Sequence, residues 1–233
     1  MDQFIYVTQS LLEGFGITCL LFALTLVLSL PLGLIISFFT MSKVKPIRAI
    51  FKVIVWIVRG VPLMLQLFIV FYLPGMLSGS GINPFGQLDK MLNIEYGIKF
   101  GGRFIATLIA FSINYACYFS EIFRGGIESI PRGQTEAGKV LGMTKSQIFF
   151  KVILMQVVKR IIPPMSNEII TLVKDTALAR VIGVVEIIKV ADMFSADAII
   201  WPLFYAGGFY LLFVGLLTIL FGFIEKKLSY YKV

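Results

Sequence analysis

A run of 29 residues, from 14 to 42, carries no charged side chain. A transmembrane helix needs about 20 mainly apolar residues, so residues 17–39 are long enough to cross a bilayer. A secretory signal peptide would begin with basic residues and end at a small-residue cleavage site, whereas Asp2 and Glu13 precede this run and no Ala-x-Ala motif follows it. We therefore expect a membrane span that stays in the mature protein.

The composition of the whole chain agrees with a membrane protein. Of the 233 residues, 58% are hydrophobic and 15% are charged, whereas a soluble domain is about half apolar and about one quarter charged. The chain has too little polar surface for a water-soluble globule, and its length allows about four to six spans.

Four further segments fit membrane spans. They are residues 53–73, 104–122, 152–173 and 199–224. The segment 152–173 is interrupted by two basic residues and by Pro163 and Pro164, and such a helix persists in a membrane only where neighbouring helices or a watery cavity satisfy its polar groups. The sequence thus predicts an all-α integral membrane helix bundle of five transmembrane helices in a single domain, residues 1–233, with this segment inside the bundle.

Basic residues fall unequally on the two sides of such a bundle. Fourteen Lys and Arg residues lie between the first two spans, after the third span and in the C-terminal tail, against five on the opposite side. Because loops rich in Lys and Arg stay in the cytoplasm, we expect the N-terminus outside and the C-terminus in the cytoplasm. This bias explains the net charge of +8 better than nucleic-acid binding does.

Several kinds of active site are excluded. The chain has no His, and its two cysteines, Cys19 and Cys117, stand alone in apolar runs. A His-based metal site, Ser-His-Asp catalysis and a disulfide framework therefore have no residues to form them. No Gly-rich phosphate-binding loop with Gly-Lys-Ser/Thr occurs, so we expect no ATPase site, no metal and no cofactor in this chain.

Residues 129–156, which we call the corner segment, combine signals for two helices that meet at a turn. Ser129 fits an N-cap with Pro131 in the first turn, and Gly142 fits the left-handed residue that ends a helix. Thr144 and Gln147 have the spacing of a capping box at the start of a second helix. An ordinary amphipathic loop would show the same caps, so the caps alone do not assign a function.

The corner segment resembles the Glu-Ala-Ala cytoplasmic loop of ABC importer permeases, through the run EAGKVLG from Glu136 followed by Ile153 and Leu154. Three further motifs resemble the branch of that family that transports polar amino acids. They are RGVP from Arg59, SEIFRGGIESIPRGQ from Ser120 and LVKDTALARVIGVVEI from Leu172. The four motifs occur in order, and the resemblance covers residues 14–228.

The resemblance implies a type I, MetI-like permease with five spans in the bacterial cytoplasmic membrane. It implies three kinds of partner: a second permease subunit in a homodimer or heterodimer, two ATP-binding subunits, and an extracellular or periplasmic substrate-binding protein. The residues implied to contact the ATPase are Glu136, Ala137, Leu141, Gly142 and Met143. Because packed helices move as rigid bodies, closure of the ATPase would be transmitted through this contact to the spans.

Three features depart from the family pattern. Gly138 replaces the second Ala, which weakens a helix by up to about 1 kcal/mol. Met155 replaces the usual Pro, so we expect the following helix to start earlier or to bend less. Residues 74–103 form a longer outer loop than usual, with a short amphipathic piece at 88–100, and no role is assigned to them.

Ionisable groups at membrane depth require a partner or a function, because each costs about 2.5 to 3.5 kcal/mol on insertion scales. Glu121 shares one helical face with Asn114 and Tyr118, and a carboxylate beside an amide and a phenol can hold an ammonium group. The alternative is that Glu121 pairs with Arg124 and ends the span.

Lys174, Asp175 and Thr176 follow the interrupted segment. Adjacent helical residues diverge by about 100 degrees, so Lys174 and Asp175 do not fully satisfy each other. Glu121 or Asp175 can accept a hydrogen bond from the ammonium group of an amino acid, and Lys174 can donate a hydrogen bond to its carboxylate. A structural ion pair within the bundle is the alternative.

Gln66, seven residues after Arg59, completes the residues predicted to bind substrate, whereas we expect a structural or gating role for Arg59. The leading hypothesis is a permease subunit that moves a polar or basic amino acid inward. The alternative is a channel, or a membrane-embedded enzyme, that uses Glu121 and Lys174 as acid, base or ion ligands. The sequence leaves open whether the substrate is glutamine, arginine, lysine, histidine or cystine.

Overall fold

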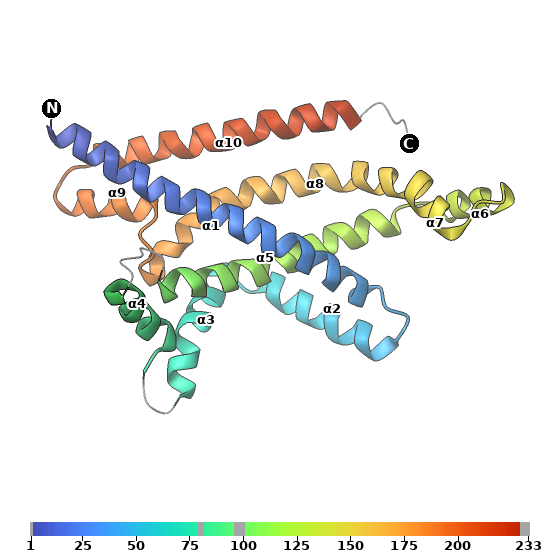
Figure 1. Ribbon diagram of the computed structural model, residues 1–233, viewed down its shortest axis with the longest axis horizontal. Helices are drawn as coiled ribbons and strands as arrows, with labels where there is room; N and C mark the ends of the chain where they lie inside the picture. Colours follow the sequence, from blue (N-terminus) through green and yellow to red (C-terminus); the bar gives the residue numbers. More distant parts are fainter. Residues whose placement is uncertain (1, 79–81, 96–100, 229–233) are drawn as a thin grey trace.

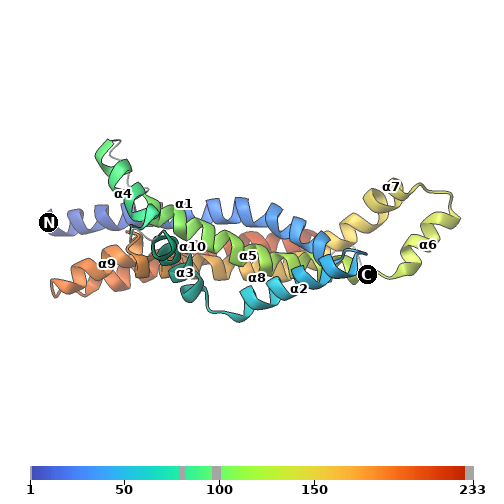
Figure 2. The ribbon, with the colours of Figure 1, turned by 90° about the horizontal axis from the view of Figure 1, so that it is seen from below.

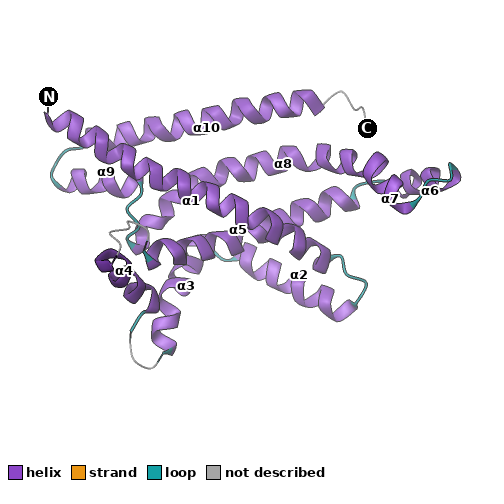
Figure 3. Cartoon of the chain, viewed as in Figure 1, coloured by secondary structure: helices purple, strands orange, loops and turns teal. Residues whose placement is uncertain are grey.

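Helices are the only regular elements in the part of the chain that the structure describes (Figure 3). The computed structural model describes residues 2–78, 82–95 and 101–228. In chain order the elements are α1 (Asp2–Thr40), α2 (Lys45–Gly60), α3 (Leu63–Leu77), α4 (Pro84–Glu95), α5 (Gly102–Glu128), α6 (Arg132–Val140), α7 (Lys145–Ile148), the π-helical η1 (Phe149–Ile153), α8 (Leu154–Asp175), the 3-10 helix η2 (Thr176–Ile182), α9 (Ile187–Ala196) and α10 (Trp201–Leu228). The predicted all-α fold class is confirmed.

Four long helices, α1, α5, α8 and α10, run along the long axis of the molecule (Figure 1). Helices α6 and α7 project beyond the bundle at one end, which we call the corner end, and α4 and α9 lie toward the opposite end, the far end (Figure 2). Helix α5 is central and contacts α1, α2, α3, α4 and α8. Helix α5 therefore joins the N-terminal helices of the bundle to α8.

Three helical stretches within the described residues are long and apolar enough to cross a membrane: residues 3–40, α5 and α10. Helices α2 and α3 pass the same test together, but they are bent by 105° at a short break. The break lies between Gly60 and Leu63, inside residues 53–73, which the sequence predicted as the second span. Helix α8, with 22 residues, is too polar for this test, as the sequence predicted.

The crossing of α1 and α5 forms the centre of the core. Leu21 on α1 and Phe111 and Phe119 on α5 are fully buried there. The helices come close at Gly33, where an added Cβ would lie 2.9 Å from both the carbonyl oxygen of Ala116 and the Cβ of Phe119. Only a residue without a side chain fits at this point.

Helix α10 is the least covered of the long helices. Phe204, Leu211 and Ile219 on it are each more than 70% exposed. Its opposite side packs on α8 and α9. In a bilayer, these exposed apolar side chains would contact lipid.

The structure confirms two of the turn signals in the corner segment and corrects a third. Thr144 and Gln147 form the predicted capping box, and Gly142 has the positive φ of 72° that was expected of it. Ser129 does not cap α6, because its hydroxyl donates to the carbonyl of Gly126 at 2.7 Å and Pro131 occupies the N-cap. The prediction of a Ser129 cap is therefore wrong.

Helix α8 is continuous with α7 through the π turn of η1, and Met155 lies in its first turn. A proline at this position would remove a backbone N–H from the helix. The sequence therefore lets α7 pass through η1 into α8 as one helical rod.

The outer loop between α3 and α5 contains a packed helix, α4. Gly102 lies so close to α4 that an added Cβ would be 2.0 Å from the carbonyl oxygen of Phe85. Asp89 on α4 accepts a hydrogen bond of 3.4 Å from the backbone N–H of Arg103 and lies 3.3 Å from its guanidinium. The remainder of the predicted amphipathic piece at 88–100, from residue 96 onward, lies outside the described residues.

The close contact at Gly33 predicts that Gly33→Val destabilises the protein by about 1 to 3 kcal/mol, because the new side chain meets the backbone of α5. Gly215→Val is the matched control, since an added Cβ on Gly215 of α10 meets nothing within 4 Å. Thermal unfolding of the detergent-purified variants measures the effect. Equal unfolding midpoints for the two variants would contradict this account of the core.

Candidate functional site

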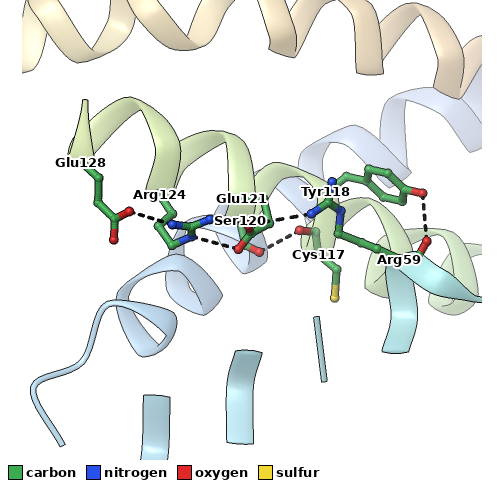
Figure 4. A network of polar contacts seen from close by, with 7 residues as sticks. All are labelled: Arg59, Cys117, Tyr118, Ser120, Glu121, Arg124 and Glu128. Carbon is green, nitrogen blue, oxygen red and sulfur yellow. Dashed lines mark hydrogen bonds and ion pairs between the residues drawn. The ribbon is translucent and has the colours of Figure 1, made fainter. Parts of the chain in front are cut away.

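A group of polar side chains lies where the break between α2 and α3 meets α5, and we call it the polar seam. It consists of Arg59, Gln66, Asn114, Tyr118 and Glu121 (Figure 4 shows its Arg59, Tyr118 and Glu121). The sequence predicted that the three α5 residues share one face, and the structure confirms this.

Gln66 and Asn114 form the part of the polar seam closest to the break. The side-chain amide of Gln66 donates to the carbonyls of Val58 and Val61, at 2.7 and 2.8 Å. Its oxygen accepts a bond of 3.2 Å from the side-chain amide of Asn114. These bonds join α2, α3 and α5 at one point.

Arg59 lies at the end of α2, over the side chain of Tyr118. The guanidinium carbon is 5.1 Å from the centre of the Tyr118 ring, within the range of a cation–π contact. The Tyr118 hydroxyl lies 3.5 Å from the carbonyl oxygen of Arg59, and the Arg59 guanidinium lies 3.8 Å from Glu121 (Figure 4). The predicted structural role of Arg59 fits these contacts.

Glu121 forms a bidentate pair with Arg124, whose guanidinium donates to its two oxygens at 3.0 and 2.6 Å. Arg124 also donates to Glu128 at 2.7 Å. Two guanidinium groups, from Arg59 and Arg124, thus flank Glu121 (Figure 4).

A cavity of about 420 Å³ opens beside the polar seam, between α5 and α8. Its lining includes Arg59, Tyr118, Glu121, Arg160, Pro164 and Glu168. This volume lies within the range of small-molecule sites. Glycines 125 and 126 line part of its floor, so its width depends on residues without side chains.

Glu168 on α8 is a functional candidate that the sequence analysis missed. Its carboxylate makes no hydrogen bond and no ion pair with any described residue, although Arg59 is close enough to interact electrostatically. The signal was present in the sequence, since Glu168 is an acid in an interrupted membrane segment and lies seven residues before Asp175, on the same helical face.

Lys174, Asp175 and Thr176 point in three directions. The Tyr115 hydroxyl donates to Asp175 at 2.7 Å. Thr176 is fully buried and lies 3.3 Å from the hydroxyl of Tyr210, at the point where α8 gives way to the 3-10 helix η2. Lys174 is exposed. The expected divergence of Lys174 and Asp175 is confirmed, because no ion pair joins them in the described part of the chain.

One side of α8 carries exposed polar side chains at intervals of four and three residues. These are Asn167, Thr171 and Lys174. The opposite side is buried and apolar, with Ile169, Leu172 and Val173 against the core. Polar groups at membrane depth usually face a protein partner or water rather than lipid.

The corner segment presents apolar side chains at its tip. Val140 and Leu141 are 88% and 78% exposed, and Glu136 and Ala137 are also exposed, whereas Met143 is half-buried. The sequence analysis did not single out Val140.

The unusual Gly138 has a local explanation. An added Cβ would lie 2.7 Å from the Ile148 side chain, so glycine lets α6 pack closely on α7. Arg160 on α8 donates to the carbonyl of Ser129, and Gln156 on α8 donates to Gln134 on α6 at 3.3 Å. The corner segment is therefore bonded to α8 as well as continuous with it.

A second cavity, of about 620 Å³, lies at the far end between α1, α5 and α9. Its polar lining includes Glu13, Asp89, Arg103 and Asp197. None of the residues predicted to bind substrate lines it.

Known proteins resemble this chain over almost its whole length. The family described as "Binding-protein-dependent transport system inner membrane component" matches residues 29–230. An L-cystine transport system permease protein of Bacillus subtilis (strain 168) is 38% identical over 221 residues, covering 94% of this chain and 86% of that protein. An arginine transport system permease protein of the same strain is 34% identical over 222 residues, covering 94% and 92%.

Solved structures agree with the sequence relatives. The structure of an amino acid ABC transporter with histidines has a TM-score of 0.78 and 27% identity, and the match covers 97% of each chain. An inward-facing methionine ABC transporter is similar in fold alone, with a TM-score of 0.64 and 16% identity over 98% of this chain and 99% of that one. The recognition of an ABC importer permease from the sequence motifs is confirmed, and the chain belongs to the family of inner membrane components of binding-protein-dependent transport systems.

Proposed function

We propose that this chain is the permease subunit of an ABC importer that moves a polar or basic amino acid across the bacterial cytoplasmic membrane. The exposed polar side of α8, next to the 420 Å³ cavity, carries this proposal. A membrane helix with Asn167, Thr171 and Lys174 on one side needs a protein or water neighbour, and a second permease subunit would enclose a watery pathway there. That subunit is either a second copy or a related chain.

Amino acid chemistry fits the lining of the cavity. Arg59 offers a guanidinium for a carboxylate, and Glu168 offers a carboxylate without a bonded partner for an ammonium group. Tyr118 and Glu121 complete the wall, although Glu121 already holds Arg124. The relatives named for cystine and arginine transport support an amino acid as the substrate class.

The residues predicted around Thr176 belong to the same pathway in this proposal. Asp175 and Thr176 lie toward the far end of α8, beyond Glu168, and Lys174 faces the uncovered side of that helix. An amino acid that crosses the subunit would pass Lys174 and Asp175 before it reaches the cavity near the corner end, whereas the fully buried Thr176 bonds to the backbone beside them.

In the complete transporter, two ATP-binding subunits would bind at the corner segments of the two permease subunits. An extracellular substrate-binding protein would deliver the amino acid at the far end. Exposed Val140 and Leu141 suit an apolar groove, and Glu136 next to them suits polar groups at its rim. This assignment places the corner end and the C-terminus in the cytoplasm and the N-terminus outside, as the distribution of Lys and Arg favours. The chain itself would hydrolyse no ATP.

We expect Gly142→Val to reduce uptake to the background level while the permease stays in the membrane at its normal amount. A side chain at φ 72° costs about 1 to 2 kcal/mol and would turn the tip of the corner segment away from the ATPase. Gly222→Val on α10, where an added Cβ meets nothing within 4 Å, is the control. Uptake into proteoliposomes that contain all subunits measures the effect, and normal uptake by Gly142→Val would refute the coupling role.

We expect Glu168→Gln to lower amino acid uptake about tenfold, because it removes the charge that would hold the ammonium group. Glu128→Gln, which changes an exposed carboxylate at the end of α5, should leave uptake within about twofold. The assay uses labelled arginine, glutamine and cystine in turn, with ATP, the ATPase and the binding protein present.

Two results would contradict this function. Equal uptake by Glu168→Gln and Glu128→Gln would remove the proposed cavity from the pathway. Uptake that persists without nucleotide and without the binding protein would favour a channel.

A further inference from the structure

The break between α2 and α3 leaves several backbone carbonyls without their helical partners, and those of Val58 and Val61 are among them. In a continuous helix, the carbonyl of Val58 would accept from residue 62, but Pro62 has no N–H. The carbonyl of Val61 would accept from Leu65, whose N–H instead donates to the Pro62 carbonyl at 3.0 Å. Unpaired carbonyls are costly in a bilayer, where no water reaches them.

The side chain of Gln66 supplies a donor to each of these two carbonyls. Its one amide nitrogen donates to Val58 and to Val61, and its oxygen accepts from Asn114 on α5. Both polar atoms of the Gln66 amide are thus bonded within the protein. Asn114 is almost completely buried, so the same bond also gives its amide a partner.

These bonds lie directly beside Arg59. Arg59 directly follows Val58, and its guanidinium lies over Tyr118, one helical turn from Asn114 on α5. The face of α5 that holds Gln66 therefore also holds Arg59 at the wall of the cavity. A change of the 105° angle at the break would move Arg59 relative to Glu121 and Glu168.

We propose that Gln66 and Asn114 are positioning residues: they hold the break of the second span at its angle and thereby place the Arg59 guanidinium in the substrate cavity. They act on the main chain and touch no substrate. The consequence for transport rests on the proposed function, whereas the consequence for the backbone does not.

Hydrogen–deuterium exchange of the complete transporter in lipid nanodiscs, without substrate, tests the backbone role. In Gln66→Leu, we expect amides of residues 57–65 to exchange about tenfold faster, because two carbonyls lose their donors. Asn114→Ala should act in the same direction with a smaller effect, and the double variant should be no worse than Gln66→Leu. Gln87→Leu, on the exposed side of α4, is the matched control and should leave these residues unchanged.

Uptake of labelled arginine, glutamine and cystine by the same complexes tests the consequence for Arg59. We expect Gln66→Leu to raise the half-saturating concentration of the transported amino acid about tenfold and to change the maximal rate less. The reason is that the Arg59 guanidinium, which would bind the carboxylate of the amino acid, is then misplaced. Arg59→Gln should give the same shift, and adding Gln66→Leu to it should give little more.

The outcomes separate the possible roles of Gln66. Unchanged exchange at residues 57–65 would overturn the proposal, and unchanged exchange with lost uptake would assign Gln66 to direct substrate contact instead. Faster exchange along the whole chain in both Gln66→Leu and Asn114→Ala would also overturn it, because the pair would then be a general stability element. A wild-type complex without amino acid uptake would refute the proposed function, and the exchange result would still decide the backbone role.

Discussion

Backbone polar groups have no water to bond with in the hydrocarbon core of a bilayer, and this constraint governs the whole molecule. Regular helices meet it with their own bonds, so α1, α5 and α10 need only apolar side chains toward lipid. The chain departs from regular helix at the break after Gly60 and at the turn from α8 into η2. At both places a polar side chain bonds to a backbone carbonyl: the partly buried Gln66 in one case and the buried Thr176 in the other.

Helix α5 lets one chain combine a rigid core with a polar interior. Its side toward α1 carries large apolar residues and accepts Gly33 at close range, so the two helices pack without a gap. Its side toward α2 and α3 carries Asn114, Tyr118 and Glu121, whose partners come from the broken span. Because both sides belong to one rod, a shift of α5 would move the core and the cavity wall together.

The residues predicted to bind substrate are divided by the structure into groups with different surroundings. Gln66 and Asn114 are bonded to each other and to the backbone, and Glu121 is bonded to Arg124. Glu168 has no bonded partner among the described residues, and it shares a cavity with Arg59, so the recognition chemistry moves toward this pair in our proposal. The sequence singles out ionisable residues at membrane depth, but their pairing depends on which helices lie side by side.

The sequence by itself determined the long apolar helices and two of the turn signals in the corner segment. Charge-free runs and the spacing of Thr144 and Gln147 predicted helices, a capping box and the turn at Gly142, because these depend on neighbours within a few residues along the chain. The four motifs also identified the family. Only the tertiary structure decided the angle of the break, the contact of Glu121 with Arg59 and the place of Glu168, because each depends on contacts between residues that are far apart in the sequence. Hydrophobic periodicity specifies which side of a helix is buried, but the helix that covers it is chosen by the packing of the whole bundle.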